Sequence, residues 1–269
     1  MPWTALWFRC LKSRSKVPVG ARRLPLRGLP SSARRALNRL CLWPALLALG
    51  IAGSASAADV IEARYDAPTT RYAHGVLGDA IEYGALVLRV KGRVLRFTLP
   101  EDRVFEDVEP RLVDVDGDGD HEVIVVETQA QLGAALAIYD ARGKIASTPH
   151  IGRTNRWLAP LGASDLDGDG LVEIAYIDRP HLAKTLRIWR FEDDALVPVA
   201  DHPGLTNHRI GEADIAGGIR DCGTGPEIIT ADATWTDIMA STLKDGQIST
   251  RPIGLHKDRS SFAAALSCE

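Results

Sequence analysis

Two acidic loops with the same pattern lie 51 residues apart in the sequence. One runs from Asp114 to Glu122 and the other from Asp165 to Glu173, and both read Asp-x-Asp-Gly-Asp-Gly-x-x-Glu. A run of apolar residues typical of a β-strand follows each loop, at 123–126 and at 174–177. Self-similarity at a period of this size indicates a chain built from repeated structural units.

The segments after the two loops also recur in the same order. A second strand-like run and a turn follow, at 135–139 and 141–143 in one copy and at 185–189 and 192–194 in the other. Weaker copies flank this pair, with strands expected at 73–77, 85–90 and 93–97 on one side and at 212–215 and 226–230 on the other. Roughly four short strands in about 50 residues is the spacing of a propeller blade.

The sequence therefore predicts an all-β fold, a single β-propeller domain over residues 58–269 with four blades of this repeat. The chain would begin inside a blade, and the run Phe262–Leu266 would supply that blade's missing strand. This last strand would close the ring and hide the sheet edges. A fifth blade or an open solenoid is the alternative.

The loops carry carboxylates at positions 1, 3, 5 and 9, and glycine at position 6 permits a sharp turn. Carboxylates that converge on one point repel one another unless a cation neutralises them. Oxygen ligands favour calcium, with magnesium second, and the lack of His and Cys disfavours zinc and copper. We expect two calcium ions, one held by Asp114, Asp116, Asp118, the carbonyl of Asp120 and Glu122, the other by Asp165, Asp167, Asp169, the carbonyl of Leu171 and Glu173. Acidic turns held by side-chain hydrogen bonds without a metal are the alternative.

An EF-hand shares the first six positions of this pattern, but it also needs a bidentate Glu at position 12 and a helix on each side. Position 12 is Val125 in one loop and Tyr176 in the other, and strand-like sequence follows both. The loops resemble instead the FG-GAP/VCBS repeat of bacterial surface proteins and of the head of integrin alpha chains.

This resemblance covers residues 110–178 closely and the rest of 58–269 loosely. It implies a propeller blade whose first inter-strand loop binds calcium. In the C-terminal copy, Asp214 is followed by Ala216 and Gly218 at positions 3 and 5, so we expect no calcium site there.

Residues 1–57 have a composition of their own, with ten Lys or Arg and no Asp or Glu. A basic flank ending at Arg39 precedes the apolar run Leu40–Ala52, and Ala55-Ser56-Ala57 supplies the small residues that a signal peptidase recognises. The run is shorter than the about 20 residues that span a bilayer. We expect a leader and signal peptide cleaved after Ala57, export to the periplasm or the extracellular space, and no membrane span in the remaining chain. A membrane anchor is the alternative.

The chain beyond this leader is acidic, because it retains only 22 of the 32 Lys and Arg residues but all 35 Asp and Glu. Nucleic acid is therefore not an expected partner, since its binding depends on Lys and Arg. Two of the four cysteines, Cys222 and Cys268, also remain. An even count in an oxidising compartment predicts a disulfide between them, and two buried free thiols are the alternative.

No pattern in the sequence indicates a catalytic centre, a phosphate loop or a nucleophile elbow. Trp157, Trp189 and Trp235 are expected to pack between blades, with an aromatic patch for sugars as the alternative. The histidines at 74, 121, 150, 181, 202 and 208 have no metal-ligand spacing.

We therefore expect an exported, calcium-binding propeller that acts without catalysis as a binding, adhesion or scaffolding module for a protein or glycan partner. One alternative is a calcium-dependent hydrolase or polysaccharide lyase built on a propeller. The other is an exported sensor or assembly factor in which calcium is purely structural.

Overall fold

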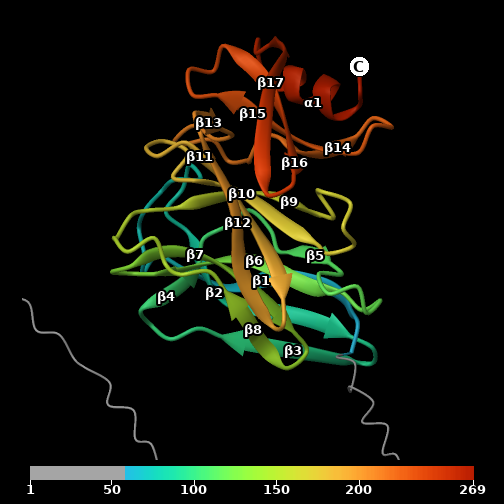
Figure 1. The fold of residues 1–269 in the computed structure, drawn as a ribbon. Helices are drawn as coiled ribbons and strands as arrows, with labels where there is room; N and C mark the ends of the chain where they lie inside the picture. The colour runs from blue at the N-terminus through green and yellow to red at the C-terminus, as the bar shows by residue number, and fades with distance from the viewer. Residues whose placement is uncertain (1–57) are drawn as a thin grey trace, which may run out of the picture. The chain divides into compact units, whose positions relative to one another are not determined.

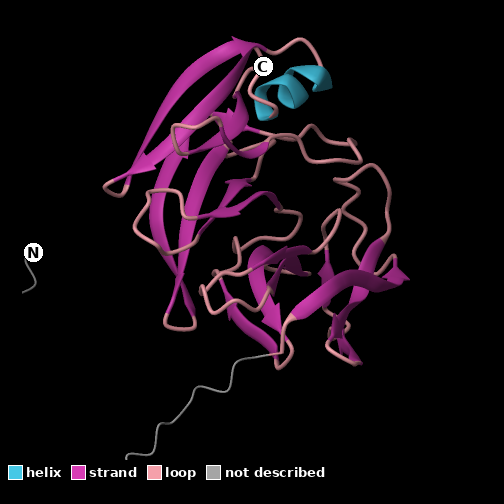
Figure 2. Cartoon of the chain, turned by 90° about the vertical axis from the view of Figure 1, so that its right-hand side faces the viewer, coloured by secondary structure: helices cyan, strands magenta, loops and turns pink. Residues whose placement is uncertain are grey.

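The computed structural model describes residues 58–269, and this part of the chain is almost entirely β-sheet (Figure 2). It contains seventeen strands and one helix in the described range, which confirms the predicted all-β class. No helix among these residues is both long and apolar enough to cross a bilayer. The predicted leader and its cleavage site lie at 1–57, outside the described residues.

Three consecutive units are antiparallel meanders in which each strand pairs with the next (Figure 1). The strands of unit two are β5 (Arg111–Val113), β6 (Glu122–Gln129), β7 (Gly133–Asp140) and β8 (Gly143–Ser147). Those of unit three are β9 (Leu158–Ser164), β10 (Glu173–Asp178), β11 (Thr185–Glu192) and β12 (Ala195–Pro203). Those of unit four are β14 (Gly218–Asp221), β15 (Pro226–Asp232), β16 (Asp237–Lys244) and β17 (Gln247–Leu255). The short β13 (Leu205–Thr206) also pairs with β15.

Unit one has three strands, β1 (Val60–Thr69), β2 (Glu82–Val90) and β3 (Arg93–Thr98), with β2 in the middle. The short β4 (Arg103–Phe105) pairs with β2 on one side and with β6 on the other, so units one and two form one continuous sheet. The sheets of the described residues are open. Strands pair within the blade-like units as predicted, but no strand pairing joins unit four to unit one.

The predicted closing strand is wrong, because Phe262–Leu266 lies in the helix α1 (Arg259–Leu266). Asp258 caps the helix by accepting a hydrogen bond from the backbone N–H of Ser260, and Ser261 completes a capping box. Three consecutive alanines follow Phe262, and alanine has the highest helix propensity. Phe262 and Ala265 bury one side of α1 in an apolar cluster with unit four, so a helix covers the sheet where a strand was expected.

Two other predicted strands are wrong as well, since 73–77 and 212–215 form loops. These loops contact each other, with the backbone N–H of Gly211 donating to the carbonyl of Val76 at 3.0 Å. Gly78 has φ of +94°, and a Cβ there would lie 2.8 Å from the carbonyl oxygen of Gly211. The close approach of these two loops therefore requires glycine. The first strands of units one and four are β1 and β14 instead.

The apolar core consists of clusters shared by neighbouring units. One cluster joins units one and two through Leu86, Phe105 and Val125, and another joins units three and four through Ile177 and Ile228. Trp157 and Trp189 belong to a third cluster, between units two and three, as predicted. The middle strands β6, β7 and β10 are buried along nearly their whole length because sheets cover both of their faces.

A disulfide joins Cys222 and Cys268, as predicted. Cys222 lies in the turn between β14 and β15, and Cys268 follows α1. The bond therefore ties the C-terminal helix to the sheet that the helix covers.

We expect the double variant Cys222→Ser/Cys268→Ser to be less stable than the wild type. The bond closes a loop across a sequence separation of 46 residues, and in the chain-entropy model its loss costs up to about 4 kcal/mol of unfolding free energy. Chemical denaturation under non-oxidising conditions measures the difference. Each single variant should match the double variant, and a double variant as stable as the oxidised wild type would contradict the prediction.

Candidate metal centre

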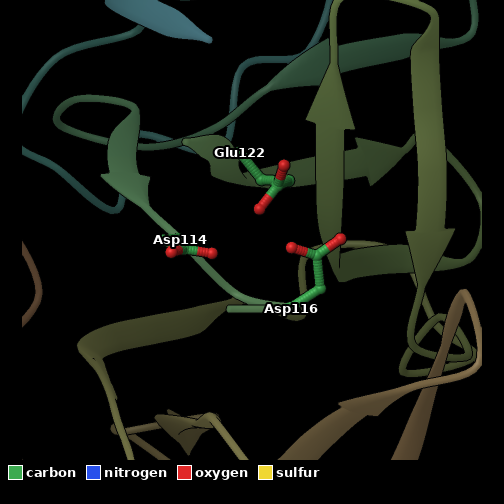
Figure 3. A group of neighbouring side chains, drawn as sticks. All are labelled: Asp114, Asp116 and Glu122. Carbon is green, nitrogen blue, oxygen red and sulfur yellow. The ribbon is translucent and has the colours of Figure 1, made fainter. Parts of the chain in front are cut away.

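The first acidic loop brings three carboxylates together. Asp114 and Asp116 lie in the loop after β5, and Glu122 is the first residue of β6. One oxygen from each of the three lies within 4.8 Å of the others. Figure 3 shows the three side chains turned toward a common space from the loop and from the strand. This arrangement can hold a metal ion.

Backbone hydrogen bonds fix the shape of this loop. The carboxylate of Asp114 accepts from the N–H of Gly117 at 2.7 Å and of Gly119 at 3.1 Å. Gly119 has φ of +92°, a conformation that L side chains rarely adopt. Glu122 accepts from the N–H of Val115 at 3.0 Å, so the glutamate that opens β6 also holds the start of the loop.

Charge is concentrated at the inner end of the loop. Glu122 is only 3% exposed. Its burial, and then the repulsion of Asp116, Asp118 and Asp114, raise the pKa of its carboxyl to about 7. Burial also raises the pKa of Asp116. Like charges about 4 Å apart repel by roughly 4 kcal/mol at an effective dielectric constant of about 20. A bound cation removes this penalty, and oxygen donors of this kind suit a hard divalent ion.

The second acidic loop repeats this geometry with Asp165, Asp167 and Glu173, whose oxygens also lie within 4.8 Å of one another. Asp165 accepts from the N–H of Gly168 at 2.7 Å and of Gly170 at 3.0 Å, and Glu173 from that of Leu166 at 2.8 Å. Each bond has its counterpart 51 residues earlier in the chain. The shared pattern of the two sequences therefore produces the same loop conformation twice.

The second loop differs from the first in containing a guanidinium group. The Nη2 atom of Arg190 lies 3.0 Å from Asp167, 2.9 Å from Asp169 and 2.5 Å from Glu173. Burial raises the pKa of Glu173, and the hydrogen bonds from Leu166 and Arg190 oppose that shift. The second group of carboxylates is thus partly neutralised by the chain itself.

The two groups of three carboxylates do not include the position-5 aspartates, Asp118 and Asp169. Asp118 is exposed, and its carboxylate accepts from the N–H of Asp120 at 2.8 Å. Asp169 is exposed and accepts from the N–H of Leu171 at 2.9 Å. These residues belong to the same turns, and the carboxylates that converge within 4.8 Å are those of positions 1, 3 and 9.

The structure has the C-terminal counterpart of these loops at a different position from the one that the sequence predicts. Asp214 does not begin it, because Asp214 lies in an irregular segment and pairs with Arg259 at 2.8 Å. The turn from β14 to β15 is the true counterpart. There Asp221 accepts from the N–H groups of Gly223 at 2.7 Å and Gly225 at 3.1 Å, two and four residues later, where Asp114 accepts from glycines three and five residues later. This turn has one aspartate, whereas the first acidic loop has four and the second has three.

In this turn, two arginines neutralise the buried glutamate. Glu227, the counterpart of Glu122, is 5% exposed and lies opposite Arg220 in the strand register. Arg220 donates to it from Nη2 at 2.7 Å and from Nε at 3.1 Å, and Arg251 also pairs with it. The glutamate is therefore neutralised within the chain.

Sequence reasoning missed Arg190, Arg220 and Arg251. The available signal was a charged residue inside a strand whose neighbours are apolar, as in the run Leu186–Phe191. Only the strand register shows which glutamate each arginine faces.

Comparison with protein families gives one match, to the FG-GAP-like repeat, over residues 114–176. The matched range begins at the first residue of the first acidic loop and runs past the end of the second. This match confirms the resemblance stated from the loop pattern. No curated protein matches the chain.

We expect Arg220→Leu to lower the unfolding free energy by about 3 kcal/mol, because removing one partner leaves a buried charge uncompensated. The remaining partner, Arg251, has a side chain that is 58% exposed and compensates Glu227 weakly. Urea denaturation measures the loss. In the double variant Arg220→Leu/Glu227→Leu both buried charges are gone, so most of the stability should return. A single variant as stable as the wild type would show that Arg220 does not neutralise Glu227.

Proposed function

We propose that this protein is an exported β-propeller-like module that binds calcium and recognises another macromolecule, a protein or a glycan, without catalysing a reaction. The observation that carries the proposal is the first acidic loop, in which the carboxylates of Asp114, Asp116 and Glu122 converge. The FG-GAP-like repeat over the same residues supports a binding or adhesion role.

Calcium is the ion that we propose for the first loop. Its carboxylates are hard oxygen donors, and no described Lys or Arg forms an ion pair with Asp114, Asp116 or Glu122. The loop is short and exposed on one side, which leaves room for additional carbonyl or water ligands. Calcium accepts six to eight oxygen ligands in flexible geometry, whereas magnesium demands a near-ideal octahedron.

Export is supported by two independent features. The first is the basic flank, apolar run and small-residue site before Ala58. The second is the disulfide between Cys222 and Cys268, a bond that persists in oxidising compartments. Extracellular calcium modules have dissociation constants of about 10⁻⁴ to 10⁻³ M, so a modest affinity would suffice in such a compartment.

We expect calcium to raise the melting temperature of the wild type and Asp116→Asn to remove most of this rise. An ion that binds only the folded state stabilises it by about 1.4 kcal/mol at ten times its dissociation constant. Calorimetric titration and thermal melting, each in calcium and in chelator, measure the effect. The matched control is Asp245→Asn, an exposed aspartate in the turn between β16 and β17. A wild type that shows neither binding heat nor a melting shift at millimolar calcium would refute calcium binding.

The binding role is tested by capturing partners from an envelope fraction with the purified protein as bait. We expect a defined set of partners that is retained in calcium and lost both in chelator and with Asp116→Asn, while Asp245→Asn retains it. Captured material that is the same in all four conditions would contradict a calcium-dependent binding role. Release of cleaved glycan by the purified protein would overturn the non-catalytic part of the proposal and favour the hydrolase or lyase alternative.

A further inference from the structure

The glutamate that ends each loop faces a different residue on the neighbouring strand. In unit three, Glu173 of β10 pairs directly with Arg190 of β11. In unit two, the pairing of β6 with β7 ends at Val123 and Tyr139, and Asp140 follows Tyr139 as Arg190 follows Trp189 in unit three. The equivalent position therefore carries a positive charge beside the second loop and a negative charge beside the first.

Strand pairing makes this difference a fixed feature of the sheet. Residues directly opposite in an antiparallel pair have their Cβ atoms about 5 Å apart, and a slip by one residue would turn every side chain of the strand to the other face. Leu186 and Ile188, on the same strand as Arg190, are at most 1% exposed in the core and hold the register. The guanidinium is thus tethered next to Glu173.

Arg190 contacts the groups that a metal ion would need. Its Nη2 atom lies 3.0 Å from Asp167 and 2.5 Å from Glu173, two of the three carboxylates of the second group. Its side chain is 18% exposed and that of Glu173 is fully buried, so water screens this pair poorly. An ion that enters the second loop has to displace the guanidinium from both oxygens or bind beside it against charge repulsion.

Asp140 occupies the equivalent position in unit two. It is 1% exposed, and its carboxylate accepts hydrogen bonds from the backbone N–H and from Nε of Arg142, both at 2.6 Å. Unit two therefore has no arginine at the position from which Arg190 reaches the second loop.

From this register we infer that Arg190 is a built-in counter-cation of the second loop, so that the two loops, alike in sequence, differ in calcium affinity and the first fills before the second. This inference rests on the proposed calcium binding. In unit four, two arginines pair with the corresponding glutamate, and the aspartates of positions 3 and 5 are absent. The number of arginines that pair with the glutamate thus increases from unit two to unit four.

The test removes the charge of Arg190 while the second loop is observed alone. Asp116→Asn removes a proposed calcium ligand from the first loop, so that binding by the second loop is measured. Arg190→Gln is then combined with Asp116→Asn in a double variant. We expect the double variant to bind calcium at least about tenfold more tightly than Asp116→Asn alone, measured by calorimetric titration, since a unit positive charge beside the ligands is removed. The matched control is Arg187→Gln on the same strand, whose guanidinium pairs with Asp178 and Asp201 away from the loop.

A second readout uses the melting temperature. The difference between calcium and chelator should be larger in Arg190→Gln than in the wild type, and Arg187→Gln should leave this difference unchanged even if it lowers both values. An unchanged or weaker calcium affinity in the Arg190→Gln double variant would overturn the inference.

The outcomes separate this inference from the proposed function. A wild type that binds calcium through Asp116, with no gain from Arg190→Gln, supports calcium binding and refutes the role of Arg190. A wild type that binds no calcium, with binding that appears in Arg190→Gln, refutes calcium binding by the native protein and supports the role of Arg190. Absence of binding in every variant refutes both.

Discussion

A buried glutamate lies at the start of the second strand in units two, three and four, and the need to neutralise its charge constrains the residues around it. Glu122, Glu173 and Glu227 are each at most 5% exposed, and an ionised carboxylate is costly at such a position unless a positive charge lies beside it. Glu122 and Glu173 each accept a hydrogen bond from a backbone N–H near the start of the preceding loop. Glu227 accepts one from the guanidinium of Arg220 on the paired strand. The three units meet the same requirement differently. In unit two the glutamate lies beside the loop aspartates, an arrangement that favours a bound cation, whereas one arginine pairs with it in unit three and two arginines do so in unit four.

This local constraint is compatible with the packing of the sheets because it is confined to strand ends. The middle strands are buried on both faces between neighbouring units, so their central residues are almost all apolar. Charged groups are accommodated at the ends of those strands. Glu127 and Asp178, near the last positions of β6 and β10, are also buried and are also paired, with Arg103 and Lys144 in one case and with Arg179 and Arg187 in the other. The second strands of units two and three thus have an apolar centre, a buried glutamate as their first residue and a second buried carboxylate, paired with two basic side chains, near their last residue.

Much of the fold was predictable from the sequence, and the errors have identifiable causes. Strands at 85–90, 93–97, 135–139, 185–189 and 226–230 are present because their apolar and branched residues favour strands in any context. The expected strand at 262–266 is a helix, because alanine favours helix and Asp258 supplies a cap that the repeat comparison ignored. Alignment with the stronger copies predicts strands at 73–77 and 212–215, but the structure has loops there. These two loops contact each other through Val76, Gly78 and Gly211 and belong to no sheet.

The sequence by itself determined the acidic loops, their conformation and the cysteine pair. The loops depend on residues close together in the chain: an aspartate whose side chain accepts backbone N–H groups three and five residues later, and a glycine that tolerates positive φ. The cysteine pair follows from the count of two cysteines beyond residue 57. Only the tertiary structure decided which charge faces each loop. Arg190 lies 17 residues beyond Glu173 in sequence, and Arg220 precedes its partner across a turn, so neither relation is visible until the strands pair. Register places Arg190, on the following strand, opposite Glu173, and Arg220, on the preceding strand, opposite Glu227, because cross-strand neighbours are set by hydrogen-bonded pairing and not by proximity along the chain.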